Sequence, residues 1–451
     1  MLRIRQKDGT WVNLGNGRAR RSLFRFDSAA SAMGPFQQPL ARDLIRIGSA
    51  FFLADRYFRR PRHLGQRCRA LEIEVEVEAL EACRGVADEW DDWANFVTHD
   101  NWRVRFVRAP ARARRRSPEA ALVPGCDAIA LFSGGLDSLC GAAMMLRQGM
   151  NPLFVTHSPP GRQAVAQLLA SLRRNLDLAQ RVDPWVSFRL QAIPYTRHGS
   201  RSLYPERSRR TRAVLFLSLA GAVAIETGIP RLFLNENGVM AVNLPMRPFN
   251  TGMNISRHAH PQTLRRFEAI LGRLWPWGGT APEVRNLLAG LTKEEAVRLL
   301  RHAAPLATAT LTCENAGQQI AMLRHHFAGT KRGLAECGLC LPCLVRRSAL
   351  AGAGVVERAD HYAFSLADAA RPRRAAEGAP MLAAVRDNPV MLEEFCRRLV
   401  RMQPAEFLEQ FTYELALLPG GWTEVQPKAE QCYALYRRFA RQYLAFARDS
   451  A

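Results

Sequence analysis

A short run of serine, glycine and aspartate residues at 133–138 has the composition of a phosphate-binding loop. It follows the apolar run 128–132 and precedes a segment of helical pattern, so the sequence predicts a strand, a tight loop and a helix. The glycines let the backbone turn and expose its N–H groups, and the helix adds the positive end of its dipole. We therefore expect pyrophosphate to bind here, through Ser133, Gly134, Gly135, Leu136, Asp137 and Ser138.

Asp137 has two expected roles at the start of this helix. Its carboxylate would cap the helix, or help to hold a magnesium ion on the phosphates. The chain lacks the G-x-x-x-x-G-K-[ST] pattern, so ordinary transfer of a γ-phosphate is not favoured. The structural alternative is a strand-to-helix turn that is merely capped by Asp137.

Three cysteines at C-x2-C-x2-C spacing, with a fourth upstream, form a candidate metal site. Thiolates at this spacing can surround a tetrahedral zinc ion, and four sulfurs leave no open position, so a structural zinc site is expected. An iron–sulfur cluster is the competing interpretation. We expect Cys313 to end a strand and a helix to begin near Leu344. The predicted ligands are Cys313, Cys337, Cys340 and Cys343, whereas the isolated cysteines are assigned to packing.

The segment 133–138 resembles the signature of the PP-loop ATP pyrophosphatases. That resemblance implies cleavage of ATP between its α and β phosphates, which yields an adenylated substrate and pyrophosphate. Together with the cysteines, it resembles the QueC family of 7-cyano-7-deazaguanine synthases. The zinc motif of that family matches Cys313, Cys337, Gly338, Cys340, Cys343 and Arg346 here.

Three further segments are similar to QueC sequences, and they imply further site residues. Arg212 begins a helix that contains Phe-Leu-Ser, and Thr156 and His157 end a strand that in this family lies by the adenine. Lys293 lies in a Thr-Lys-x-Glu segment and would neutralise phosphate, although by itself it would be taken for a solvated residue in a first helical turn. The resemblance thus implies Asp137, Ser138 and Lys293 as catalytic residues, and Thr156, His157 and Arg212 as nucleotide-binding residues.

The similarity extends over roughly 127–347, and it fails on the substrate side. The segments 234–239, 244–248 and 257–261 replace a family segment rich in Tyr, Pro and Asp, which changes the expected substrate but not the use of ATP. We expect Glu236 and Asn237 to contact substrate, since they follow a strand on the ligand side of the sheet. For His258, the sequence fits contact with the substrate and an ordinary loop position equally well.

An extended chain of this kind looks like the QueC-like proteins of bacterial anti-phage defence operons, such as QatC. For that group the resemblance implies ATP-dependent ligase or synthase chemistry on a small carboxylate of the 7-deazaguanine type. It also implies a protein acceptor from the same operon. The expected cofactors are ATP, Mg2+ and Zn2+.

Alternating strand and helix patterns predict an α/β fold from residue 127 onward. Apolar runs at 128–132, 153–155, 185–188 and 232–234 favour buried parallel strands, with helices between them. We expect a doubly wound parallel sheet of the PP-loop, adenine-nucleotide-hydrolase-like type, with its ligand site at the carboxyl ends of the strands. The predicted domains are an α+β amino-terminal module over 1–122, the PP-loop domain over 123–350 and a helical region over 351–451.

The composition indicates where the protein is located and which partners it binds. The longest apolar run, 213–225, is shorter than the roughly 20 residues of a membrane span, and the amino terminus lacks an apolar stretch of the signal-peptide type. We therefore expect a cytoplasmic protein without a membrane partner. The formal net charge of +22 would attract nucleic acid, but solvated basic loops around 112–116 and 207–212 fit equally well.

Three alternative functions remain open from the sequence. The chain could be the 7-cyano-7-deazaguanine synthase of queuosine biosynthesis itself. A PP-loop tRNA sulfurtransferase fits the charge and the cysteines, but it needs an accessible thiol or a cluster, which a closed zinc site does not provide. A non-catalytic adapter that senses ATP would release neither AMP nor pyrophosphate.

Overall fold

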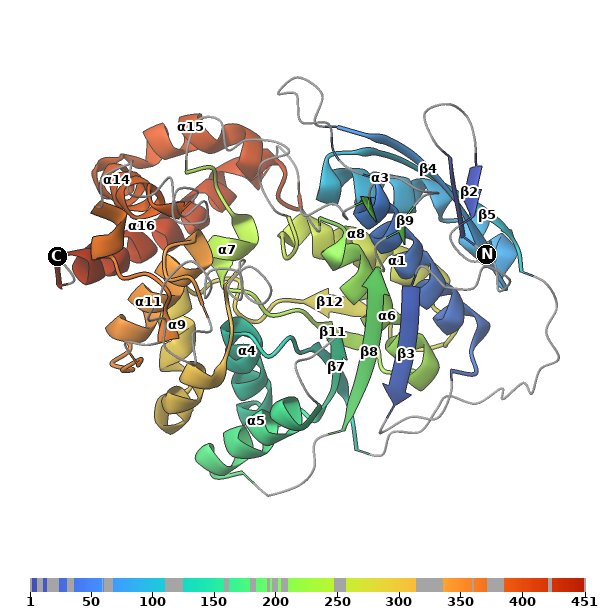
Figure 1. Cartoon of the computed structure of the whole chain (residues 1–451), viewed down its shortest axis with the longest axis horizontal. Helices are drawn as coiled ribbons and strands as arrows, with labels where there is room; N and C mark the ends of the chain where they lie inside the picture. The colour runs from blue at the N-terminus through green and yellow to red at the C-terminus, as the bar shows by residue number, and fades with distance from the viewer. Residues whose placement is uncertain are drawn as a thin grey trace.

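The computed structural model describes most of the chain. The described residues are 2–5, 11–13, 24–30, 36–58, 60, 68–109, 125–157, 162–178, 184–192, 195–196, 202–203, 210–246, 257–313, 336–358, 361–370, 385–420 and 424–449. The basic loop 112–116 and residues 207–209 of the second basic loop therefore lie outside the described part. Figure 1 shows the helices α14, α15 and α16 at one end of the long axis and β2, β4 and β5 at the other.

A six-stranded sheet forms the centre, in the order β12-β11-β6-β7-β8-β3. The first five strands run parallel, and β3 pairs antiparallel with β8 at one edge. The expected strands of the PP-loop region are confirmed. The four expected strands are β6 (Ala128–Leu131), β7 (Pro152–His157), β8 (Trp185–Ala192) and β11 (Arg231–Phe233). The sequence did not predict the two edge strands, β12 (Glu283–Arg285) and β3 (Phe24–Ala30).

Alternate side chains of the strands enter different hydrophobic cores on the two faces of this sheet. Ile129 and Val155 pack with the helices α1 (Pro39–Tyr57), α6 (Arg212–Thr227) and α8 (Pro261–Leu274). Ala130 and Phe154 pack with elements on the other face, which are α4 (Leu136–Arg147), α5 (Arg162–Asn175), α9 (Lys293–Arg298) and the 3-10 helix η2 (Arg301–Ala309). The period of two along each strand therefore explains a layered α/β structure.

The strand order reverses between β6 and β11. From β6 the chain proceeds outward to β7 and β8 on one side, and later to β11 and β12 on the other. A crevice opens at the carboxyl ends of the strands at such a point, because the two neighbouring connections leave in opposite directions. The loop 133–138 follows β6, and Glu236 follows β11, so both lie at this crevice.

The amino-terminal segment forms a second sheet in the order β2-β1-β4-β5. Its strands are β1 (Leu2–Arg5), β2 (Trp11–Asn13), β4 (Ala70–Val77) and β5 (Asn101–Arg108). Between β4 and β5 lie α2 (Leu80–Arg84) and α3 (Ala87–Thr98). Along β4 the apolar residues are buried and the glutamates are half-buried, as the alternating pattern predicts.

This segment is continuous with the central layer. Its strand β3 extends the six-stranded sheet, and Phe51 of α1 shares one hydrophobic core with Val214 of α6 and Ile129 of β6. The domain limits at 122/123 and 350/351 stay a prediction, but the described helix α1 and strand β3 pack with the central sheet. A short hairpin of β9 (Tyr195–Thr196) and β10 (Ser202–Leu203) lies outside both sheets.

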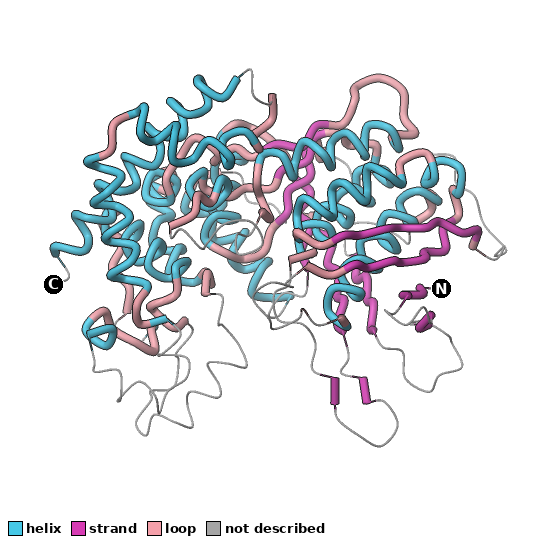
Figure 2. The backbone as a smooth tube through the Cα atoms, turned by 90° about the horizontal axis from the view of Figure 1, so that it is seen from above, coloured by secondary structure: helices cyan, strands magenta, loops and turns pink. Residues whose placement is uncertain are grey.

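The carboxy-terminal part is helical, as expected, and Figure 2 shows helices throughout this end of the molecule. It contains α14 (Asn388–Arg401), α15 (Pro404–Ala416) and α16 (Val425–Asp449), with the 3-10 helix η4 (Ala367–Ala370) before them. These helices pack on α11 (Leu341–Gly352) and α7 (Gly238–Val242). Tyr436 of α16 donates its hydroxyl to the Val239 carbonyl and accepts from the Leu244 N–H, each at 2.8 Å.

Within the described residues, no helix combines the length and the apolar character that crossing a bilayer requires.

Candidate functional site

The phosphate loop begins where β6 ends. Gly134 has φ +75°, a left-handed conformation that favours glycine, and the Ser138 hydroxyl donates to the Gly135 carbonyl at 2.8 Å. The Ser133 side chain is exposed, whereas Leu136 is 1% exposed and packs in the core, so only the backbone of Leu136 is available to an anion. The loop, the glycine turn and the following helix α4 have the arrangement that anion binding requires.

Asp137 does not cap helix α4, and this corrects the expected role. The N-cap residue is Gly135, and no side chain caps this end. The Asp137 carboxylate is buried and forms an ion pair with the Lys293 ammonium group at 2.5 Å. Its other oxygen accepts from the backbone N–H and the side-chain amide of Asn237 at 3.3 and 3.1 Å.

Lys293 is only 3% exposed, so it is not a solvated residue of the first turn of α9. Its ammonium group donates to Asp137, and Lys293 is not among the residues that line the cavity in front of the loop. Burial alone would raise the pKa of Asp137, but the charge of Lys293 and the hydrogen bonds from Glu236, Lys293 and Asn237 outweigh burial and lower this pKa. Asp137 and Lys293 are therefore both charged and mutually compensated.

Glu236 lies beside this pair, and its pKa is shifted in the opposite direction from that of Asp137. Burial, and then the negative charge of Asp137, raise the pKa of Glu236 well above its ordinary value. Its carboxyl group accepts from the Asn237 amide at 3.0 Å and shares a hydrogen bond with Asp137. One carboxyl group is thus neutral and the other ionised, the usual outcome where two acids share a buried site.

A cavity of about 370 Å³ opens in front of the loop. It brings together residues that are far apart in the chain and that the sequence places in one nucleotide site. Its apolar wall includes Val155, Phe216 and Leu219, which suits a planar base. Its polar lining residues are Ser133, Ser138, Thr156, His157, Arg212, Asn235, Glu236 and His258.

Thr156 and His157 line the end of β7, but their side chains differ in availability. Thr156 lines the cavity, and its hydroxyl oxygen is buried without a hydrogen-bond partner among the described residues. His157 Nε2 accepts from the Leu190 N–H at 3.3 Å, and its ring packs on Phe216 with centroids 5.2 Å apart. Burial, and then the charge of Arg212, lower the pKa of His157 to about 4, so this side chain is neutral at pH 7.

His258 also lines the cavity, a position that the sequence left undecided. Its Nδ1 atom is buried without a partner among the described residues. Burial, followed by the nearby charge of Arg212, lowers the pKa of His258 to about 3, which keeps the imidazole neutral. A family pattern does not reveal this residue, because it lies in the segment 257–261 where the chain departs from QueC sequences.

Asn237 and Glu236, the two expected substrate residues, have different surroundings. Asn237 is 0% exposed, and its side-chain oxygen caps α7 by accepting from the Met240 N–H at 3.2 Å. With its amide bound to Asp137 and Glu236, it positions those carboxyl groups. Glu236 lines the cavity and is the one of the two within reach of a ligand. Substrate binding by either residue stays a prediction.

The four expected zinc ligands meet in one cluster. The Sγ atoms of Cys313, Cys337, Cys340 and Cys343 all lie within 4.8 Å of one another. The Cys337–Cys343 and Cys340–Cys313 sulfurs are 3.8 and 3.9 Å apart, and tetrahedral zinc with Zn–S bonds of about 2.3 Å requires roughly this separation. The residues therefore fit a zinc ion, and all ten cysteines are free of disulfides.

The backbone around the sulfurs explains how the site is shaped. Gly338 has φ +88°, and a Cβ atom there would lie 2.4 Å from the Phe364 carbonyl oxygen. Cys340 is the N-cap of α11, which begins at Leu341, three residues before the expected start. The strand expected to end at Cys313 is wrong: 310–313 is irregular and follows the 3-10 helix η2.

Arg346 of the shared cysteine motif has a structural role here. It is fully buried, and it donates to the Thr310 hydroxyl and the Ala307 carbonyl, each at 2.8 Å. It also forms ion pairs with Glu336 and Glu357. The side chain thereby ties the segment that leads to Cys313 onto α11, which brings the distant cysteine to the other three.

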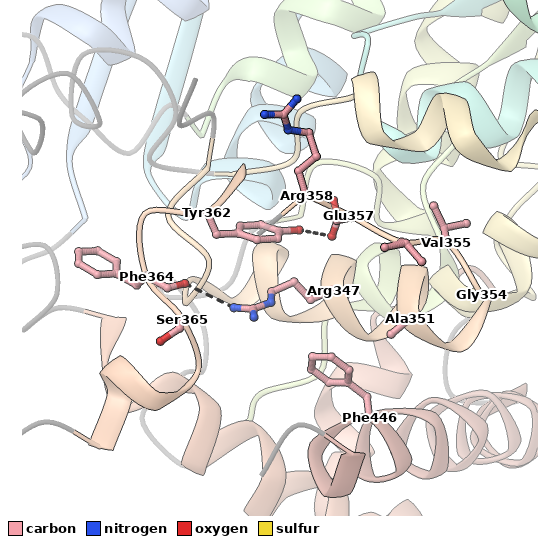
Figure 3. A pocket seen from close by; sticks show the side chains of 11 residues that line it. Arg347, Ala351, Gly354, Val355, Glu357, Arg358, Tyr362, Phe364, Ser365 and Phe446 are labelled. Carbon is pink, nitrogen blue, oxygen red and sulfur yellow. Dashed lines mark hydrogen bonds between the residues drawn. The ribbon is translucent and has the colours of Figure 1, made fainter. Parts of the chain in front are cut away.

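Another cavity, of about 480 Å³, is lined by Arg347 and Ala351 of α11, by residues between 354 and 365, and by Phe446 of α16 (Figure 3). Tyr362 donates to Glu357 at 2.5 Å, and the Arg347 guanidinium lies over the Tyr362 ring and donates to the Gly338 and Phe364 carbonyls. These polar groups are engaged with one another. None of the residues predicted to bind the nucleotide lines this cavity.

Comparison with curated proteins gives one relevant relative. The chain is 23% identical over 248 residues to a 7-cyano-7-deazaguanine synthase of Methanothrix thermoacetophila, and this match covers 52% of the chain and 98% of the relative. No protein-family model matches the chain. No solved structure matches it either. The chain is thus distantly similar to a QueC-type synthase over about half of its length.

Proposed function

We propose that this protein is a QueC-like, ATP-dependent enzyme of the PP-loop type that adenylates a carboxylate substrate. One observation carries the proposal: the loop 133–138 opens into a cavity at the carboxyl ends of β6 and β7, with the Ser133 side chain exposed and the Thr156 hydroxyl unpartnered. The similarity to a 7-cyano-7-deazaguanine synthase supports it. Ser133, Ser138 and the loop amides would bind the departing pyrophosphate, and Arg212 would stabilise charge near the α-phosphate.

The proposed reaction has two steps. A substrate carboxylate oxygen attacks the α-phosphorus of ATP, the bond from that phosphorus to the bridging oxygen breaks, and pyrophosphate leaves. A nucleophilic acceptor then attacks the acyl carbon and releases AMP. The protein contributes mainly orientation and charge stabilisation, as in other phosphoryl-group chemistry.

Magnesium is expected with ATP, but Asp137 does not fit a magnesium ligand as arranged here. One of its oxygens accepts from Lys293 and the other from Asn237, so neither is open. An ion that accompanied the nucleotide would be held through the phosphate oxygens themselves. Zinc at the four cysteines would be structural, because four thiolates fill its coordination shell.

The substrate class we propose is a 7-deazaguanine carboxylate or a related planar carboxylate, and the setting is a bacterial anti-phage operon with a protein acceptor. The relative covers only about half of this chain, and the amino-terminal β3 and α1 and the carboxy-terminal helices enlarge the fold around the site. The second candidate is the synthase of queuosine biosynthesis, which the similarity to a 7-cyano-7-deazaguanine synthase favours.

Intact mass spectrometry of co-expressed operon partners distinguishes the two functions. A covalent mass increase on a partner, together with AMP release that the partner accelerates, supports a protein acceptor. The matched control is the Ser133→Ala enzyme, because Ser133 is exposed and its removal leaves no buried charge. Efficient conversion of 7-carboxy-7-deazaguanine and ammonia to the free nitrile by the isolated protein, with no partner modified, would assign queuosine synthesis instead.

A further inference from the structure

An aspartate of the amino-terminal segment contacts the residue that precedes the cavity-lining Arg212. Asp55, near the end of α1, is 0% exposed, and its carboxylate accepts from the Thr211 N–H at 3.2 Å and from the Thr211 hydroxyl at 3.0 Å. Thr211 is the N-cap residue of α6, and no side-chain hydrogen bond caps this helix from within. Asp55 thus supplies the acceptor and the negative charge that a helix start favours.

The Asp55 side chain is itself fixed by a buried ion cluster. The Arg69 guanidinium binds Asp55 at 2.5 Å and Asp100 at 2.6 Å, and Arg60 bridges the same two carboxylates. Burial alone would raise the pKa of Asp55, but Arg69 and Arg60 lower it, so the carboxylate is ionised. A charged group held from several sides has little freedom to follow a displaced helix.

The residue that follows Thr211 is Arg212, which begins α6 and lines the cavity. The Arg212 guanidinium lies 5.2 Å from the centre of the Phe216 ring, one turn further along the same helix. Rotation or fraying of the first turn of α6 would therefore move Arg212 relative to the loop 133–138. A displacement of about 1 Å at such a residue is enough to weaken a site.

We propose that Asp55 is a positioning residue of the nucleotide site, which acts through Thr211 to hold Arg212 toward the cavity. The amino-terminal segment is then part of the ATP site, in addition to any role in docking an acceptor. A second contact agrees with this: Phe52 of α1 packs its ring against His157, with centroids 6.3 Å apart. The inference rests on the proposed function, namely that this cavity binds ATP.

Variants of the full-length protein test the hydrogen bonds between Asp55 and Thr211. Thr211 is not among the residues that line the cavity. Thr211→Val keeps the shape and the backbone N–H but removes the hydroxyl, whereas Thr211→Ser keeps the hydroxyl. Asp100→Asn is the matched control, because it weakens the same ion cluster without touching Thr211. Asp55→Asn tests the other side of the link and keeps the test available should Thr211→Val fail to fold.

Calorimetric ATP binding and steady-state kinetics with ATP varied provide the measurements. We expect Thr211→Val to raise the Kd and KM for ATP about three- to tenfold, the range that loss of one ordinary hydrogen bond implies, and Thr211→Ser to remain near wild type. Asp55→Asn should weaken ATP binding in the same direction. Asp100→Asn should lower Tm while the Kd for ATP stays within about twofold of wild type.

The outcomes separate this inference from the proposed function. If Ser133→Ala loses ATP binding but Thr211→Val binds ATP like the wild type, Asp55 does not position the site. An equal loss of ATP affinity in Asp100→Asn and Thr211→Val would show that the loss comes from general destabilisation of the protein. That result would overturn the inference. Absence of ATP binding by the wild-type protein would overturn the proposed function, and the inference with it.

Discussion

The carboxylate of Asp137 and the ammonium group of Lys293 form a buried ion pair at 2.5 Å, across a separation of 156 residues. Asp137 belongs to the first turn of α4 and Lys293 to the first turn of α9. The pair therefore joins two helices that pack on the same face of the sheet. It also means that Asp137 is as much a structural residue as a candidate catalytic one.

Removal of either member of this pair should destabilise the protein. Asp137→Asn leaves Lys293 as an uncompensated buried charge, and Lys293→Met does the same to Asp137, so each should lower the free energy of unfolding by roughly 3–5 kcal/mol. The double variant should lose much less than the sum, which urea denaturation can measure as a double-mutant cycle. Additive losses would show that the two side chains are not coupled.

Ser133→Ala should suppress AMP release while leaving the fold intact. Ser133 is exposed at the cavity, so the substitution removes a hydroxyl donor to pyrophosphate and creates no buried defect. We expect at least a tenfold loss of kcat/KM for ATP, an order of magnitude typical for removal of one such donor. Ser171→Ala on α5, outside the cavity lining, is the control. Near-normal turnover by Ser133→Ala would remove this hydroxyl from the mechanism.

Glu236 should make stability depend on pH. Its pKa is raised in the folded chain, so above about pH 4.5 the unfolded chain releases a proton that the folded chain retains. The free energy of unfolding should therefore fall as pH rises from this value toward the folded-state pKa. Glu236→Gln cannot titrate and should lose this slope. Urea denaturation of both proteins at several pH values checks the prediction, and parallel pH dependences would contradict it.

Purified protein should contain one zinc ion per chain. Cys343→Ser should lower the zinc content and Tm, because it removes one of four ligands whose binding energy contributes to folding. Cys68→Ser, at an exposed and isolated cysteine, should change neither quantity. Elemental analysis provides the measurement. Iron with a visible absorption band, or a metal-free wild-type protein, would disagree with the zinc assignment.

Local patterns allowed much of the central fold to be predicted. Strand β6, the glycine turn and helix α4 are encoded by neighbouring residues, and the cysteine spacing encodes most of the metal cluster. The helical region expected over 351–451 corresponds, in its described part, chiefly to α14, α15 and α16. Each of these features depends on contacts within a few residues or on a clear repeat of apolar residues along the chain.

Features that depend on distant partners were not visible in the sequence. Lys293 has the local pattern of a solvated residue in a capping box, and only its distant partner Asp137 explains its burial. Asp55 gives no local signal, because the residue that it holds lies 156 positions later. Likewise β3 joins the central sheet through antiparallel pairing with β8, which residues 24–30 alone do not specify.

The double hydrogen bond of Tyr436 has a consequence for the order in which the molecule can be assembled. Its hydroxyl joins the carbonyl of Val239 to the N–H of Leu244, on either side of the end of α7. Because α16 is synthesised after every other described element, the Val239 carbonyl and the Leu244 N–H lack this partner until α16 has been made. The nascent protein can form its central sheet before then, but α7 and the residues that follow it gain this support only when α16 packs on them.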